Sequence, residues 1–536
     1  MHDFTRFSML TAVIAAAGVS LCANAATSAT ALPSSPSTVY LTEVPSGAVT
    51  STMVKEGDGF LNINSQLTVL PAKGSLTSVA RDGNDIYIGH PFSWHSVPGL
   101  LKGQVEGDKA TFAFPQLVNS YVDDINGVLT PQRFYAVVCD MVVKGSTANM
   151  VPTEAQTYTF TIGADGSLTP DDPELFLGEY YFYEGDWDWT LNGDFYTSIT
   201  PIAEQPAQAP ADADFQPMVL TWPHSIEGSV LAAPVSVAFD GDDCYVKGIA
   251  VGIKDLPDAV VKGSKEADGT YSFPSNQYLG ESWLYGFTQY FITGDALYQG
   301  NSVSFEPQAD MVFSASDTDG TLTSDMSFII APAVQEDPEE LYYEKIYQTP
   351  TMTAVAADAK VTSLVTPVLM QYYPADEYVP AEEIDFMVSM LSAEGCLLDM
   401  SKLYFEVWTD DTPYTFTKAN YPSLNADTTQ IPFGYSDMQG FVYQTELLQQ
   451  VLVFNPKYET LRLRLVYKPS ADETIYSDYI TVQDKSGVDL TLSDGEAVAG
   501  YFDLQGRPVV NPSAGLYIRA IRKADGSVNY QKAICR

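Results

Sequence analysis

The sequence predicts an all-β protein built from several domains. Short runs of Val, Ile, Tyr, Phe and Thr are separated by Asp-Gly and Gly-Asp pairs, which tolerate the positive φ angles of tight hairpin turns. Long amphipathic helical patterns are lacking, and 536 residues are too many for one hydrophobic core. We therefore expect tandem antiparallel β modules, then a sandwich of the fibronectin or immunoglobulin type, and a small C-terminal β domain.

The composition excludes one class of partner. The chain has 68 acidic and 27 basic residues and a net charge of −41. Such a surface repels phosphate, so nucleic acid is not an expected partner. Hydrophobic residues make up 45% of the chain and charged residues only 18%, which is typical of folded domains, so disorder does not explain the acidity.

Residues 1–25 have the pattern of a secretory signal peptide. Arg6 precedes an uncharged run over residues 8–22, and Ala-Asn-Ala follows at the expected cleavage site. The run is shorter than the roughly 20 residues that a membrane helix needs, and no later stretch is long enough. We therefore expect an exported protein without a transmembrane segment, with a flexible N-terminal segment over residues 26–50.

The chain contains an internal duplication. Residues 79–88 (VARDGNDIYI) align without gaps on residues 237–246 (VAFDGDDCYV), and further matched blocks recur in the same order. We infer two copies of one β module. The first module covers residues 51–202 and the second residues 218–349. Residues 203–217 between them are rich in Ala and Pro, a composition that favours a linker.

A different strand pattern begins near residue 350. Leu403, Phe405 and Val407 alternate with other residues, which is typical of a strand with one buried face. We assign residues 350–485 to the β-sandwich. Residues 486–536 then form the C-terminal β domain.

The end of the chain resembles a known sorting signal. Residues 500–507 read GYFDLQGR and residues 515–518 read GLYI. This pattern resembles the C-terminal sorting-type domain of Bacteroidota secreted proteins. The resemblance implies type IX secretion, a cell-surface or extracellular location, and attachment to the outer membrane through the C-terminal domain.

The body of the chain has a second resemblance. It is carried by residues 239–248, 256–263, 273–280 and 408–417. These stretches are similar to repeats and to a last sandwich domain in uncharacterised secreted proteins of gut Bacteroidales. The resemblance implies a lineage and an architecture but no reaction.

No motif in the sequence assigns a catalytic residue. The phosphate-binding loop Gly-x-x-x-x-Gly-Lys-Ser/Thr, the Gly-x-Ser-x-Gly elbow and His-Glu-x-x-His are absent. His90, His95 and His224, the three histidines outside the signal peptide, are interpreted as surface or turn residues rather than as metal ligands or triad members.

Two functions therefore stay open. The first is a non-catalytic exported surface protein whose tandem modules bind a glycan, a host protein or an envelope component. The second is a secreted carboxylate-dependent hydrolase such as a glycosidase, which needs only two well-placed carboxylates. A deep cleft with converging carboxylates would favour the hydrolase.

An aromatic patch is the ligand-binding candidate. Tyr183, Trp187, Trp189 and Tyr196 lie among Gly and Asp residues, and exposed indole and phenol rings of this kind stack on sugars. In the alternative interpretation these rings pack into a core. Alternation along two strands would turn only about half of them outward.

Calcium is the one cofactor that the residue types suggest. Asp240, Asp242 and Asp243 could supply oxygen ligands to this hard cation. The EF-hand spacing is lacking, however, and an Asp-Gly hairpin turn explains the same residues.

Overall fold

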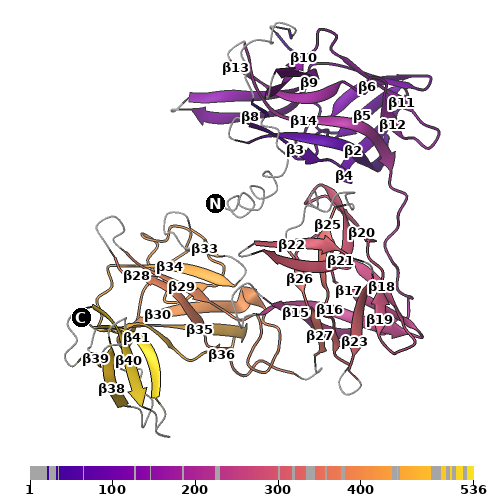
Figure 1. The fold of residues 1–536 in the computed structure, drawn as a ribbon. Coiled ribbons are helices and arrows are strands. Elements are labelled where there is room, and N and C mark those ends of the chain that lie inside the picture. Colours follow the sequence, from indigo (N-terminus) through magenta and orange to yellow (C-terminus); the bar gives the residue numbers. More distant parts are fainter. Residues whose placement is uncertain are drawn as a thin grey trace. The chain divides into compact units, whose positions relative to one another are not determined.

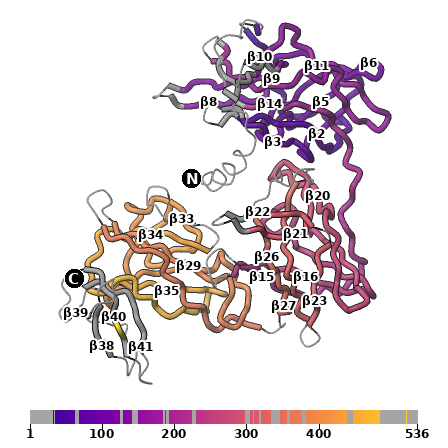
Figure 2. Tube along the Cα trace, in the orientation of Figure 1, coloured from indigo at the N-terminus to yellow at the C-terminus, as the bar shows by residue number. Residues whose placement is uncertain are grey.

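The prediction of an all-β chain is confirmed by the computed structural model. The chain divides into two compact units, Met1–Ala357 and Asp358–Arg536, and each is described by itself (Figures 1 and 2). The structure describes residues 21–22, 32–33, 35–63, 66–125, 128–144, 147–183, 186–223, 230–299, 302–308, 310–316, 320–332, 345–355, 359–375, 381–437, 443–444, 447–484, 497–502, 508–509, 515–522 and 528–535. In these ranges no helix is long and apolar enough to cross a membrane.

The first module is a closed antiparallel barrel with a second sheet attached. Its ring follows the order β2–β4–β5–β6–β7–β11–β12–β14 and closes where β14 pairs with β2. The ring strands are β2 (Val49–Ile63), β4 (Ser75–Asp82), β5 (Asp85–Gly89), β6 (Leu101–Glu106), β7 (Lys109–Ala113), β11 (Thr157–Ile162), β12 (Leu168–Pro170) and β14 (Asp186–Pro201).

The attached sheet uses the far ends of the longest ring strands. The strand β9 pairs with β8, β10 and β13, and β13 pairs with β14. On the other side β2 pairs with β3, which also pairs with β1. These strands are β1 (Leu21–Cys22), β3 (Gln66–Pro71), β8 (Gln116–Ile125), β9 (Val128–Lys144), β10 (Thr147–Pro152) and β13 (Phe176–Tyr183).

The second module repeats this arrangement. Its closed barrel runs β15–β16–β17–β18–β19–β23–β24–β27, and β21 pairs with β20, β22 and β25 as β9 does in the first module. The strand β25 also pairs with β26. The strands are β15 (Gln216–Pro223), β16 (Val230–Asp240), β17 (Asp243–Lys247), β18 (Val260–Lys265), β19 (Tyr271–Phe273), β20 (Gln277–Ser282), β21 (Phe287–Gln299), β22 (Ser302–Pro307), β23 (Met311–Ala315), β24 (Leu322–Thr323), β25 (Ser327–Ala331), β26 (Tyr347–Gln348) and β27 (Thr351–Ala354).

Matching side chains make matching contacts in the two modules. Lys102 forms an ion pair with Asp85 at 2.6 Å, and Lys262 forms one with Asp243 at 2.8 Å. In both modules the lysine ammonium also lies 5.6 Å from the centre of a tyrosine ring. The duplication inferred from the sequence is therefore present both in the strand pairing and in individual contacts.

The module boundaries differ from those expected. The strand β27 belongs to the second module, because its pairing with β15 and β24 closes that barrel, so the module extends past residue 349. The first two residues of β15 lie in the segment expected to be a linker. Residues 26–50 were expected to be flexible, yet Leu32 is buried in a core cluster and Leu41 accepts a hydrogen bond from the Leu100 amide at 2.7 Å.

The second unit begins with two sheets that share one hydrophobic core. Alternate residues of β29 and β34 meet alternate residues of β30 and β35 in that core, which makes a sandwich. One sheet contains β28 (Val368–Tyr373), β29 (Ala381–Met387), β33 (Tyr443–Gln444) and β34 (Leu448–Phe454). The other contains β30 (Leu403–Thr409), β31 (Thr412–Pro413), β32 (Ile431–Pro432), β35 (Thr460–Ser470), β36 (Glu473–Tyr476) and β37 (Ile480–Asp484).

Leu403, Phe405 and Val407 are all buried in the sandwich core, as their alternation predicts. The short 3-10 helix η4 (Met400–Lys402) precedes their strand. At the chain end β38 (Ala497–Phe502), β39 (Pro508–Val509), β40 (Gly515–Arg522) and β41 (Val528–Cys535) form a separate antiparallel sheet in the order β39–β38–β40–β41. The Asp-Leu-Gln-Gly-Arg stretch of the sorting motif lies outside the described residues.

Candidate functional site in the first unit

The aromatic patch expected on the surface divides between two sides of the sheet. Trp187 is only 8% exposed; its ring packs edge-on against Tyr135 and Phe182, and its Nε1 donates to the Pro33 carbonyl at 2.9 Å. Tyr196 is 1% exposed in the barrel core, where its hydroxyl donates to the Pro91 carbonyl. The expectation of exposed, sugar-stacking rings is therefore wrong for these two residues, because both faces of β14 are covered: Trp187 packs in one core cluster and Tyr196 in another.

The other two patch residues have a different outcome. Tyr183 is half-buried and stacks on Tyr181 with ring centres 5.8 Å apart, and Tyr181 in turn stacks on Phe134. The side chain of Trp189 lies outside the described residues. The predicted four-residue platform is thus not assembled as one surface.

The aspartates proposed as calcium ligands form the turn between β16 and β17. Gly241 adopts a φ of 62°, which the turn requires and which glycine accepts without strain. Asp240 and Asp242 are exposed, and Asp243 is engaged by Lys262 and by the Tyr245 hydroxyl. Within the described ranges no group of three potential metal ligands is present.

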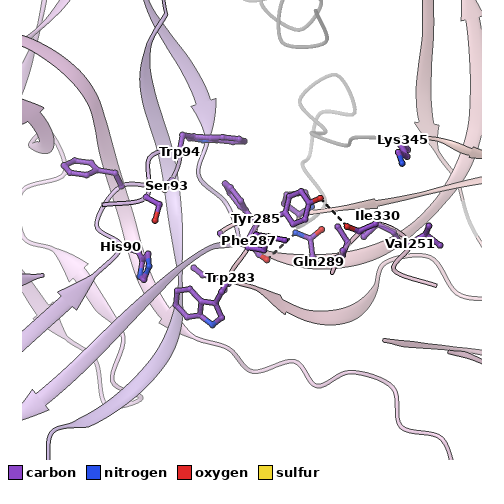
Figure 3. Close-up of a pocket in the computed structure, with 18 of the residues that line it drawn as sticks. His90, Ser93, Trp94, Val251, Trp283, Tyr285, Phe287, Gln289, Ile330 and Lys345 are labelled. Carbon is purple, nitrogen blue, oxygen red and sulfur yellow. Dashed lines mark hydrogen bonds between the residues drawn. The ribbon is translucent and has the colours of Figure 1, made fainter. Parts of the chain in front are cut away.

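A cavity of about 420 Å³, the junction pocket, lies where the two modules meet (Figure 3). The modules are joined there by main-chain hydrogen bonds: the Leu76 amide donates to Gly286, and the Thr288 amide donates to Gly74. The first module contributes His90, Ser93 and Trp94, and the second contributes the residues around the β20–β21 turn and parts of β25 and β26. Besides those three, the lining includes Val251, Trp283, Tyr285, Phe287, Gln289, Ile330, Lys345 and Tyr347.

Aromatic rings from both modules meet in this pocket. The His90 ring lies 5.0 Å from the Trp283 ring, and the Trp94 ring lies 4.8 Å from the Phe287 ring. Trp283 is 42% exposed, so part of its indole remains open to solvent. A Cβ at Gly59 would lie 2.5 Å from the Trp94 ring, so the glycine on β2 allows this ring to rest there.

A few polar groups stand among the rings. The Nδ1 atom of His90 is buried and has no hydrogen-bond partner among the described residues. Burial, helped by the charge of Lys55, lowers the pKa of His90, which favours the neutral imidazole. Tyr347 donates to the Val251 carbonyl at 2.7 Å, and the described lining contains no carboxylate.

Three buried charged residues lie beneath the loop that carries His90, Ser93 and Trp94. Lys55 and Asp194 form an ion pair at 3.3 Å, and their side chains are 0% and 1% exposed. Burial lowers the pKa of Lys55 against the opposing charge and hydrogen bond of Asp194, and burial raises the pKa of Asp194. Glu179, also fully buried, lies 2.8 Å from His95 Nδ1 and accepts from the Asn192 amide at 2.8 Å.

A second cavity, of about 320 Å³, lies near the linker and holds two carboxylates, Glu56 and Glu204. The Tyr290 hydroxyl donates to Glu204 at 3.1 Å. Burial raises the pKa of Glu56, and the charge of Lys73 opposes this shift.

Comparison with known proteins adds no assignment to these sites. No protein-family model matches the chain, and no curated protein matches it significantly. The sequence analysis singled out His90 and His95 but interpreted them as surface or turn histidines. It missed the junction pocket, because Trp94 and Trp283 belong to different modules and no spacing rule connects them. His224 lies outside the described residues.

Proposed function

We propose that the chain is a non-catalytic exported surface protein that binds a carbohydrate in the junction pocket. The observation that carries this proposal is the partly exposed Trp283 indole, which lines an aromatic cavity and lies beside the His90 ring. Flat aromatic faces attract the apolar face of a pyranose ring.

The size and lining of the pocket support the same ligand class. Its volume falls within the roughly 300–1,000 Å³ that is common for small-molecule sites. Such sites combine an apolar wall with a small number of polar groups that fix orientation. His90, Ser93 and Gln289 are polar residues of the lining that can supply such groups, since each side chain can form hydrogen bonds with sugar hydroxyls. A mono- or disaccharide fits this description better than a long polymer.

The export and the surface location are part of the same proposal. They rest on the signal-peptide pattern and on the resemblance of the chain end to a sorting-type domain. A glycan-binding module is useful to a cell only where it meets glycans, and the cell surface is such a place.

The proposal is tested by substituting the exposed indole. Trp283→Ala should remove the stacking surface and weaken glycan binding about tenfold, which corresponds to about 1.4 kcal/mol. The melting temperature should change little, because a ring exposed to this extent leaves no closed void. Binding is measured on a glycan array and then by calorimetry with the best array hit.

Phe239→Ala is the matched control. Phe239 is an exposed aromatic residue of the same module, 49% accessible, and lies outside the pocket lining. This variant should bind like the parent. No array signal for the parent, or equal affinities for Trp283→Ala and the parent, would contradict the proposal.

A carboxylate-dependent hydrolase is the second candidate, and the cavity beside the linker favours it. General-acid catalysis needs a carboxyl group that stays protonated near neutral pH, and burial raises the pKa of Glu56 in that direction. Glu204 supplies the second carboxylate of the same cavity.

Oligosaccharide cleavage distinguishes this candidate from simple binding. If the chain is a hydrolase, the parent should release new reducing ends from an oligosaccharide panel. Glu56→Gln and Glu204→Gln should each lower the rate at least about a hundredfold. The matched control is Glu281→Gln, since Glu281 is a glutamate of the same compact unit and lies outside this cavity. No release by the parent would end the hydrolase candidate.

A further inference from the structure

The core of the first module contains three charged side chains that have no charged counterpart in the described part of its duplicate. Lys55, Glu179 and Asp194 are each at most 1% exposed. Removing charges from water is costly even when they are paired, and apolar residues of similar size often replace such pairs without loss of stability. The second module allows a direct comparison at the same positions.

The strand register identifies the counterpart of Lys55. Lys55 on β2 lies opposite Ser75 on β4, and Leu220 on β15 lies opposite Ala233 on β16. Ser75 and Ala233 are equivalent, because the gapless alignment of the duplicated blocks extends along these two strands. Leu220, fully buried, therefore occupies the Lys55 position.

The same reasoning identifies the counterpart of Glu179. Gln116 accepts a hydrogen bond from the Lys102 amide, and Gln277 accepts one from the Lys262 amide, so the two glutamines are equivalent. In the first module, Gln116 lies opposite a residue of β9 that also pairs with Glu179. In the second module, Gln277 lies opposite a residue of β21 that also pairs with Ile330. Ile330 therefore occupies the Glu179 position.

Asp194 has an uncharged counterpart as well. Leu177 lies two residues before Glu179 and pairs with Asp194, whereas Phe328 lies two residues before Ile330 and pairs with Tyr347. The second module thus has Leu220, Ile330 and Tyr347 at the three positions, all uncharged and buried. The barrel fold itself does not require the three charges.

All three charged residues contact one loop, residues 90–95, between β5 and β6. Lys55 donates to the His90 carbonyl at 2.9 Å. Asp194 accepts from the Ser93 amide at 2.9 Å and from the Ser93 hydroxyl. Glu179 holds His95. The loop therefore has a charged anchor near its start, its middle and its end.

We infer that Lys55, Glu179 and Asp194 are positioning residues that hold residues 90–95 in the conformation that presents His90, Ser93 and Trp94 to the junction pocket. The part of this inference that concerns ligand affinity rests on the proposed function. The equivalent loop of the second module is held by the uncharged Tyr347 hydroxyl, which donates to the Val251 carbonyl, and it contributes Val251, Gly252 and Ile253 to the pocket. The first module is thus the half that supplies polar and aromatic contacts from this loop.

The test uses the double variant Lys55→Leu with Asp194→Leu in the full chain. Removing both partners leaves no unpaired buried charge, so the melting temperature should stay close to that of the parent. Hydrogen exchange of the ligand-free chain should become at least tenfold faster at the Ser93 amide and its neighbours, because the amide loses its acceptor. Amides at residues 251–253 are the internal control and should not change.

Glu179→Gln provides a second, milder variant. The amide group is nearly isosteric and keeps a contact with Asn192, so the chain should fold even if the double variant does not. Exchange should accelerate around His95 and remain at the parent rate in β16 and β17. Exchange unchanged around His95 in this variant, or unchanged at Ser93 in a folded double variant, would overturn the inference.

Glycan affinity is the second readout and separates the two proposals. With the best array hit as the probe, the double variant should bind at least fivefold more weakly than the parent at equal melting temperature. Faster loop exchange in a chain that binds no glycan would sustain the positioning role and end the carbohydrate proposal. Equal affinity despite faster exchange would overturn the link between the loop and the ligand.

Discussion

At the residue scale, strand alternation decides whether an aromatic side chain becomes core or surface. Along β13, Tyr180 is buried and donates to the Met150 carbonyl, whereas its neighbour Tyr181 is half-buried and stacks on Phe134 and Tyr183. The sequence predicted that only about half of the patch would face outward. It did not identify which half, because bulges in the pairing of β13 and β14 shift the register within the patch.

Trp187 gives the sharpest prediction at this scale. Trp187→Ala should open a cavity between Tyr135 and Phe182 and remove the hydrogen bond to Pro33, at a cost of roughly 3–5 kcal/mol in the free energy of unfolding. Urea denaturation monitored by circular dichroism measures the change. Glycan binding by the fraction that stays folded should equal that of the parent, since Trp187 is not part of the junction pocket.

Phe239→Ala again serves as the control, because an exposed ring should contribute within about 0.5 kcal/mol. A Trp187→Ala chain as stable as this control would show that the ring does not pack in the core.

At the element scale, local sequence patterns predict individual strands well, but they predict poorly which distant strands pair to close a barrel. The alternation in β30 and the Asp-Gly turn between β16 and β17 are short-range signals, and both features are present. Closure of the first barrel needs β2 to pair with β14, more than a hundred residues later, and no local signal specifies that pairing. The same limit explains the misplaced boundary before β27, whose partners lie far back in the chain.

The junction pocket illustrates this limit at the level of the site. The loop after β5 was visible in the sequence as a stretch rich in His and aromatic residues, but its partners come from the β20–β21 turn. The buried anchors beneath it were equally invisible, since Lys55 and Asp194 lie far apart in the sequence and resemble ordinary surface charges there. Aligning the two modules would have shown that charged residues of the first are replaced by uncharged residues in the second, but not that the charged residues contact one loop.

At the scale of the whole molecule, the chain consists of two compact units, and the second ends in a separate four-stranded sheet. The chain has a net charge of −41, which disfavours binding to polyanions. The proposed surface location rests on the signal-peptide pattern and on the chain end, and the part played by the chain end can be tested without disturbing the modules that carry the pocket.

Deleting residues 497–536 removes β38 to β41 together with the sorting-type motif. The first unit should keep its melting temperature, because its cores contain no residue of this sheet. If the sheet is an export address, the truncated chain should pass the inner membrane, be trapped in the periplasm and resist protease added to intact cells. The full-length chain should be digested under the same conditions, and a periplasmic marker protein verifies that the cells are intact. Equal digestion of both chains would show that export does not depend on this segment, and the surface location would then need another signal.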